Sequence, residues 1–481
     1  MWLLFPVEMA IKMLPDPDAE KPVQNQIFGN DLLSQLDPQD PFIRLSEAIN
    51  WSIFESGFSP YYSADQGCPA IPIRRMVGLL ILKALEDLSD ESVVLAYKRN
   101  PYYQVFCGAR EFERKPPCSS TELVHFRQRI GESGVQMIFA ESVRLHGRQA
   151  EAAEVHIDST VQEKHITYPT DSKLAIKIIN CLNKLAKQHG IQQRRTYVKE
   201  VKTLRLACRY FRHVKRRRKA SRALKRLRTI ARTLIRELRR RLPAELVSQY
   251  QADFDLYERV LNQQPKDKNK IYSLHEPQVY CIAKGKDHKA YEYGAKASVV
   301  STAKDGIILA AVHHDKPIHD NHSLPEVLER AMLVRNKPIK AAVCDRGYRG
   351  KRQFGDTTII LPGAPLKRDN RYQRDKKRKR CRRRAAIEPL IGHLKSDHRL
   401  GRCYLKGQLG DAINLLMAAC AWNLKKWLAL IFWRLKMPAM VPHTADNHHN
   451  PGRKPVMIAL MIFAIAMTID AARSTLDRYP F

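Results

Sequence analysis

A long helical segment separates the first strand of this chain from the strands that must pair with it. The run VHIDST at 155–160 is β-prone, and the next strand signals are YEYGAKASVVST at 291–302 and IILAAVH at 307–313. Between them, residues 171–262 repeat Leu and Ile at helical spacing among Lys and Arg. One strand is not stable by itself, so these strands must share a sheet and the helical segment must be an insertion.

Two further strand signals follow the hairpin that residues 291–302 and 307–313 are expected to form. They are IKAAVCDRGY at 339–348 and TTIILP at 357–362, and after them come a loop rich in Lys and Arg and a helix around Glu388. The order of strands and helices predicts an α/β fold in which helices flank a mixed sheet.

Capping patterns mark where several helices begin. Ser323 and Glu326 form a capping box with Pro325 in the first turn, which predicts a helix that runs to about Arg335. A similar pattern at Ser119 opens the last helix of an N-terminal region that is helical throughout.

These signals divide the chain into six segments. We expect an N-terminal tail, a helical domain, the first part of the sheet-containing core, a basic helical insertion, the remainder of that core and a C-terminal tail that is possibly an extension. Their boundaries are 1–29, 30–150, 151–170, 171–275, 276–430 and 431–481.

The charge of the chain indicates a polyanionic partner. The 481 residues contain 83 Lys and Arg against 49 Asp and Glu, a net charge of +34. Residues 194–241 contribute +19 and residues 366–384 contribute +10. Clusters of this density suit a phosphate backbone and favour nucleic acid over an anionic membrane surface or a merely solvated helix face.

The cysteines and the chain ends add little to this interpretation. The ten Cys show no spacing that a structural zinc site needs, which suits a reduced, cytosolic protein. The N-terminus lacks the basic start and cleavage site of a signal peptide. Residues 456–469 are apolar, but they are shorter than a membrane-spanning helix requires, so no membrane association is expected.

Three acids are placed where they could form one site. Asp158 and Asp345 end apolar strands, and Glu388 begins a helix. Three carboxylates without Cys neighbours favour hard divalent cations such as Mg²⁺, with Mn²⁺ as a substitute. Each acid alone fits a turn or a helix cap equally well, and their joint appearance is what points to a site.

Two other groups of residues allow both a functional and a structural interpretation. The helix after Ser119 carries Arg127 and Arg129 and is suited either to a DNA groove or to an ordinary protein surface. The four histidines of HHDKPIHDNH, residues 313–322, are more typical of a polar loop than of a metal site.

Several blocks of the chain together resemble the DDE transposases of bacterial insertion sequences, the class with an RNase H-like core. They are HIDST, HEPQVYCIAKGKDHKAYEYGAKASVV, CDRGYRG and IEPLIGHLKSDHRLGRCYLKGQLGDAINLLMAACAWNLKKW. The resemblance extends over most of the chain. It implies that the core, 151–170 and 276–430, is catalytic with Asp158, Asp345 and Glu388 as its metal-binding acids, and that the helical domain 30–150 binds DNA ends.

The family's signature around its third acid is Tyr, two residues, Arg, three residues, Glu, six residues, Lys. This chain has Arg384, Glu388 and Lys395 at that spacing, whereas Cys381 stands where the family has Tyr. The resemblance therefore implies phosphate contacts for Arg384 and Lys395. The remaining expected DNA contacts are Arg346, Arg127, Arg129, Arg216, Arg217 and Arg218.

The resemblance implies a transposase that cleaves the terminal inverted repeats of its element and joins the ends to target DNA. Because two ends must meet, a homodimer or larger assembly is expected, in the bacterial cytoplasm at the nucleoid. A metal-dependent nuclease or resolvase without strand transfer, and a decayed copy that only binds DNA, remain the alternatives.

Overall fold

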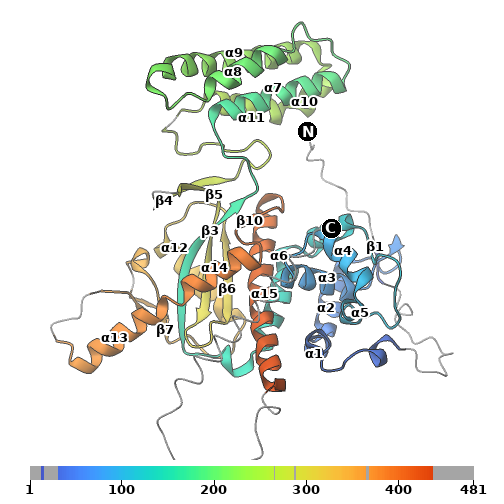
Figure 1. Cartoon of the computed structure of the whole chain (residues 1–481), viewed down its shortest axis with the longest axis vertical. Coiled ribbons are helices and arrows are strands. Elements are labelled where there is room, and N and C mark those ends of the chain that lie inside the picture. Colours follow the sequence, from blue (N-terminus) through green and yellow to red (C-terminus); the bar gives the residue numbers. More distant parts are fainter. Residues whose placement is uncertain are drawn as a thin grey trace, which may run out of the picture. The chain divides into compact units, whose positions relative to one another are not determined.

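A computed structural model of the chain describes residues 12–15, 31–264, 266–286, 289–350, 352–363 and 368–436. It combines a group of N-terminal helices, a mixed sheet with flanking helices, and a second group of helices that interrupts the sheet sequence (Figure 1). The expected mixed α/β architecture is confirmed. Residues 456–469 and most of both predicted tails lie outside the described residues.

The N-terminal region is built from six α-helices. They are α1 (Pro41–Ala48), α2 (Trp51–Phe58), α3 (Ile73–Leu85), α4 (Asp90–Arg99), α5 (Pro101–Phe106) and α6 (Ser120–Arg144). The predicted cap at Ser119 is present, because its hydroxyl accepts a hydrogen bond from the Glu122 N–H. Short strands β1 (Lys12–Met13) and β2 (Cys68–Pro69) pair in parallel beside these helices.

The sheet contains eight strands, in the order β4-β5-β3-β7-β9-β8, with β6 paired to β5 and β10 to β3. Strands β5 and β7 lie on either side of β3, the first antiparallel and the second parallel to it. The strands are β3 (Glu154–Lys164), β4 (Tyr280–Lys286), β5 (Lys289–Thr302), β6 (Ile308–His314), β7 (Ala341–Val343), β8 (Gln353–Phe354), β9 (Thr357–Ile360) and β10 (Arg402–Cys403).

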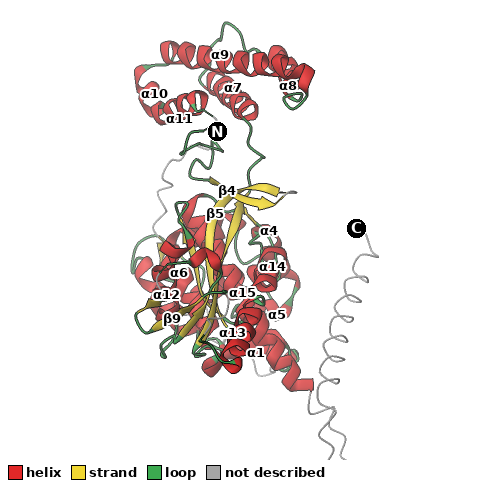
Figure 2. Ribbon diagram, turned by 90° about the vertical axis from the view of Figure 1, so that its left-hand side faces the viewer, coloured by secondary structure: helices red, strands yellow, loops and turns green. Residues whose placement is uncertain are grey.

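Helices cover both faces of this sheet (Figure 2). Helix α12 (Asp320–Leu333) packs on β5 and β6, and α14 (Ile387–Asp397) packs on β3. The long helix α15 (Gly407–Lys436) joins the same hydrophobic core, which also includes the N-terminal helices. Asn423 of α15 is fully buried and exchanges two hydrogen bonds with the backbone of Ile308, at 2.9 Å each.

Among the described residues, α15 is the one helix long and apolar enough to cross a membrane. Half of that apolar stretch is buried inside the protein, and it carries the buried polar residues Asp411 and Asn423. Both side chains have protein partners, so the helix has the character of a core helix.

The segment between β3 and β4 forms a helical group with its own hydrophobic core. Its helices are α7 (Asp171–Gln188), α8 (Val198–Cys208), α9 (Arg217–Arg241), α10 (Ala244–Gln249) and α11 (Gln251–Asn262). Helix α9 buries Leu227, Leu234 and Leu238 and exposes Arg and Lys on its other side. We call α7–α11 the insertion.

Two local predictions were wrong, and three strands of the sheet were missed. Helix α12 begins at Asp320 and not at Ser323, so Pro325 lies inside the helix rather than in its first turn. Residues 371–384 form the helix α13 (Arg371–Arg384) instead of a loop, because Lys and Arg are good helix formers and Asn370 caps the helix in a complete capping box. Strands β4, β8 and β10 were not predicted.

Candidate active site

Asp158 and Asp345 come from neighbouring parallel strands. His156 of β3 is level with Val343 of β7, so each acid follows its level residue by two positions. Asp158 accepts a hydrogen bond from the Ser159 N–H at 2.8 Å, and Asp345 accepts one from the Gly347 N–H at the same distance. The two carboxylates are therefore level with each other, but the prediction that Asp158 ends its strand was wrong, because β3 continues to Lys164.

Glu388 approaches these acids from α14, which begins one residue before it. Arg384, the last residue of α13, connects the two elements. Its guanidinium lies 3.2 Å from Asp158 Oδ2 and 3.6 Å from Glu388 Oε1. The Asp158 and Arg384 side chains are each 16% exposed, whereas Glu388 is 65% exposed. Glu388 is therefore the most exposed of these three side chains.

The pKa of Asp158 reflects the charged groups around it. Burial raises the pKa of Asp158, and the charges of Asp345 and Glu388 raise it further, while the Ser159 N–H and Arg384 lower it. His156 precedes Asp158 on the same side of β3. Burial and then the charges of Arg383 and Arg384 lower the pKa of His156 to about 4, so this imidazole is neutral near pH 7.

The donor set suits a hard divalent cation, because all three predicted acids offer carboxylate oxygen. Among the described residues, however, no three His, Cys, Asp or Glu side chains stand close enough together to hold a metal ion. Arg384 lies between Asp158 and Glu388 and neutralises part of their charge.

Sequence reasoning missed a fourth acid, Asp320, at the first position of α12. A Cβ atom added to Gly347 would lie 2.8 Å from Asp320 Oδ2 and 3.0 Å from Asp345 Oδ1, so the two carboxylates flank this glycine. Lys296 lies 2.7 Å from the other oxygen of Asp320. Asp320 belongs to HHDKPIHDNH, the segment that its histidines marked as a polar loop in the sequence.

Tyr348 is fully buried beside the same acids. Burial raises the pKa of Tyr348 far above its usual range, followed by the charges of Asp320, the Cys344 thiol, Asp158 and Asp345. Its hydroxyl has no hydrogen-bond partner among the described residues. The buried phenol therefore keeps its proton and is uncharged at neutral pH.

A positively charged groove lies along α13. It encloses about 1180 Å³, and Arg346 lines it together with Arg374, Arg378 and Arg382. Cys381 also lines this groove, so the residue that replaces the expected tyrosine faces the same cationic surface. Tyr372 lies on α13 too, but it lines a different groove with Lys379 and Arg383 and is no substitute at position 381.

Arg127, one of the expected DNA contacts, is buried in the N-terminal region. Its side chain is 6% exposed and makes a bidentate ion pair with Asp90 at 2.7 and 2.8 Å. Leu123 and Ile130, one helical turn before and after it, are also buried, and this spacing could have placed Arg127 on the inner face. Arg129 is partly exposed and stacks on the Tyr62 ring at 4.9 Å.

The other predicted cations are distributed over two elements. Arg216, Arg217 and Arg218 are exposed at the start of α9 in the insertion. Lys395 is half-buried on α14, about two turns after Glu388. The structure thus brings Arg384, Lys395 and Arg346 to the elements that carry the acids, and it leaves the α9 arginines on the insertion.

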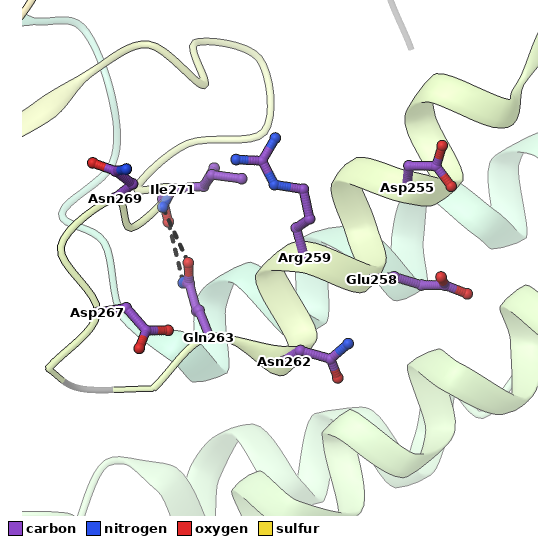
Figure 3. Close-up of a pocket in the computed structure, with 8 residues that line it drawn as sticks. All are labelled: Asp255, Glu258, Arg259, Asn262, Gln263, Asp267, Asn269 and Ile271. Atoms are coloured by element: carbon purple, nitrogen blue, oxygen red, sulfur yellow. Dashed lines mark hydrogen bonds between the residues drawn. The ribbon is translucent and has the colours of Figure 1, made fainter.

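The insertion also contains a pocket of about 500 Å³ at the end of α11 (Figure 3). Gln263 occupies one wall and exchanges two hydrogen bonds with the Ile271 backbone, at 3.0 and 3.2 Å. The acids Asp255 and Glu258 of this wall pair with Arg239. These polar groups therefore join α11 to α9 and to the chain segment that follows α11, which is a structural role.

Comparison with known proteins gives two family matches. Residues 30–129 match the family described as "Transposase domain (DUF772)", and residues 263–424 match the family described as "Transposase DDE domain". The second match contains Asp345 and Glu388, whereas Asp158 and helices α7–α11 up to Asn262 lie outside both matches.

A curated relative from Rhizobium meliloti, the uncharacterized protein ORF8 in the nfe locus, is 35% identical over 197 residues. The match covers 40% of this chain and 95% of that protein. No solved structure matches the chain. Transposase families account for most of the N-terminal helices and for the sheet apart from β3, with two of the three acids, and the chain belongs to the DDE transposases of insertion sequences.

Proposed function

We propose that this transposase cleaves the ends of its insertion sequence and joins them to target DNA at a site formed by Asp158, Asp345 and Glu388. One observation carries the proposal. Asp158 and Glu388, which lie 230 residues apart in the sequence, both pair with Arg384, and Asp345 follows the neighbouring strand at the level of Asp158. Such a convergence is expected of a catalytic site and not of three independent helix caps.

The arrangement of the sheet supports an RNase H-like core. A central strand, β3, carries the first acid, and its neighbours are an antiparallel hairpin strand, β5, and a parallel strand, β7, which precedes the second acid. Helix α14 then lays the third acid over β3. This order follows the expectation that the resemblance carried.

The acids would hold Mg²⁺ or Mn²⁺. Divalent ions bound there would activate the attacking oxygen and stabilise the leaving oxygen of a phosphodiester. Arg384 would exchange Asp158 for a phosphate when DNA enters, because a guanidinium binds either anion in the same bidentate geometry. Lys395 and the groove beside Arg346 would hold the flanking strand.

The partners follow from this chemistry. We infer that the protein binds double-stranded DNA at the terminal inverted repeats and at the target, as a homodimer or larger assembly in the bacterial cytoplasm. The N-terminal helices contribute to end binding through surfaces other than Arg127, since that side chain is committed to Asp90.

Strand transfer by the purified full-length protein tests the proposal. The substrates are pre-cut element ends and a target plasmid with Mg²⁺, and the variants are Asp158→Asn, Asp345→Asn and Glu388→Gln. Each should reduce joining by at least about a thousandfold while DNA binding persists. Asp375→Asn, which removes an acid of α13 that pairs only with its helix neighbour Arg378, is the matched control.

The outcomes separate the alternatives. Joining by the parent and its loss in all three variants supports a transposase. Cleavage without joining indicates a nuclease or resolvase, and binding without either reaction indicates a decayed copy. If the three variants join ends as fast as the parent, the assignment of the acids is wrong.

A further inference from the structure

The turn between α8 and α9 combines exposed apolar side chains with dense positive charge. We call residues 209–219 the tip; they contain seven Lys or Arg and no Asp or Glu. Tyr210, Phe211 and Val214 are 43%, 46% and 90% exposed. Exposed aromatic and β-branched side chains together on one short turn indicate a contact surface, because water disfavours such groups.

The tip is held in a defined conformation. The His213 carbonyl accepts hydrogen bonds from the N–H groups of Arg216 and Arg217, at 3.1 and 2.9 Å. The Arg216 guanidinium stacks on the Tyr210 ring at 4.7 Å. Just below the tip, the Cys208 thiol contacts the carbonyl of the buried Ala220 and ties α8 to α9. Phe211 and Val214 are therefore presented by a preformed turn.

A line of cations continues from the tip along α9. We call this line the stripe; it consists of Arg218, Arg222, Lys225, Arg232, Arg236 and Arg240, all exposed. At 1.5 Å per residue it extends over about 33 Å, close to the roughly 34 Å of one turn of B-DNA. The opposite, apolar side of α9 is buried in the core of the insertion.

These features favour DNA over two other partners. A second copy of the tip would bring fourteen positive charges together without a counterion, at an energetic cost. A membrane would need the apolar side of α9, which is already buried. Duplex DNA suits both the stripe and the tip, because its phosphates can pair with the cations of the stripe and its stacked bases offer apolar surface to the tip.

We propose that the tip inserts Phe211 and Val214 between base pairs of duplex DNA held along the stripe, and thereby unstacks and bends the duplex. The inference rests on the proposed function for its partner, DNA. It adds a deformation of that partner by a segment that lies outside both family matches. Apolar wedges of this kind unstack a base step at a cost that the surrounding phosphate contacts offset.

The test uses the full-length protein without metal and a linear duplex of mixed sequence. Permanganate reports unstacked thymines, and energy transfer across an end-labelled duplex of about 25 base pairs reports bending. The variants are the pair Phe211→Ser with Val214→Ser, and the pair Arg218→Gln with Arg222→Gln. Leu333→Ser, which removes a 75% exposed leucine from α12, is the matched control.

The parent and the Leu333 variant should raise thymine reactivity about fivefold or more over free DNA and bend the duplex. The Phe211 and Val214 pair should abolish both signals while the affinity falls by less than about tenfold. The Arg218 and Arg222 pair should instead lower the slope of log affinity against log salt by about 2.

Asp158→Asn should unstack DNA as fully as the parent does. An error in the catalytic assignment would therefore show in the joining assay, whereas an error in the proposed insertion of Phe211 and Val214 would show in thymine reactivity. No increase in thymine reactivity with the parent, or an equal increase with the Phe211 and Val214 pair, overturns the inference. So does a Phe211 and Val214 pair that loses self-association or binding to anionic vesicles while DNA unstacking stays unchanged.

Discussion

Replacing Arg384 by Gln should make the DNA-free protein bind divalent metal more tightly. The guanidinium lies 3.2 Å from Asp158 Oδ2, and both side chains are 16% exposed. Charges about 4 Å apart attract by about 4 kcal/mol at an effective dielectric constant near 20. The second contact, to the 65% exposed Glu388, contributes at most about 1 kcal/mol after screening.

A metal ion that binds Asp158 must break its ion pair with Arg384. Hydration of the released guanidinium then recovers much of the free energy of that ion pair. The net penalty is therefore about 1–3 kcal/mol, and Arg384→Gln should bind Mn²⁺ about tenfold to a hundredfold more tightly. Titration of Mn²⁺ followed by electron paramagnetic resonance measures this directly. Arg383→Gln removes the same charge from the preceding residue of α13 and should change the Mn²⁺ affinity by less than about threefold.

Addition of DNA should raise the Mn²⁺ affinity of the parent far more than that of Arg384→Gln, because DNA phosphate supplies the alternative partner for the arginine. If Arg384→Gln binds Mn²⁺ no more tightly than the parent does, the guanidinium does not compete with metal and the reasoning fails.

Three further predictions concern groups around the sheet. Asp320→Asn should weaken Mn²⁺ binding about tenfold by removing a charge beside Asp345, with Glu329→Gln of the same helix as control. Asp411→Ala should lower the free energy of unfolding in urea by about 3 kcal/mol, because it removes the nearer of two carboxylates that pair with the 3% exposed side chain of Lys164 and leaves the weaker contact with Glu276 at 3.5 Å; an effect below about 1 kcal/mol would contradict this. Burial, then the charges of Lys296 and His313, lowers the pKa of His314 to about 4, so the unfolded chain takes up the proton first and stability falls as the pH drops. Between pH 7 and 5 the loss should be about 2 kcal/mol, and His314→Gln should flatten this part of the unfolding profile.

The sheet could be predicted because its signals are local. The apolar runs around Asp158 and Asp345 identify strands by composition and end at the acids, and the helix start near Glu388 follows from Pro389. The structure has strands at both positions and a helix start at Ile387, but β3 continues through Asp158 to Lys164, which its local sequence did not reveal.

Contacts between distant segments could not be predicted in this way. Asp320 acquires its place beside Asp345 only when α12 docks against the sheet, and nothing in its own neighbourhood shows this. The ion pair between Arg127 and Asp90 joins residues 37 positions apart. The density of charge in α13 suggested a solvated loop, although the intrinsic preference of Lys and Arg for helices and the cap at Asn370 decide its conformation.

The polar network around Lys164 lies where the insertion leaves the sheet and returns to it. Lys164 ends β3, and it contacts Asp411 of α15 at 2.8 Å and Glu276, just before β4, at 3.5 Å. The two chain segments that lead into and out of α7–α11 are thus fastened to the same buried charges, while α7–α11 bury their own apolar residues. An exchange of 171–262 for a short linker would leave these contacts of Lys164 intact, so the insertion can change in sequence or be replaced while the strand that carries Asp158 keeps its register.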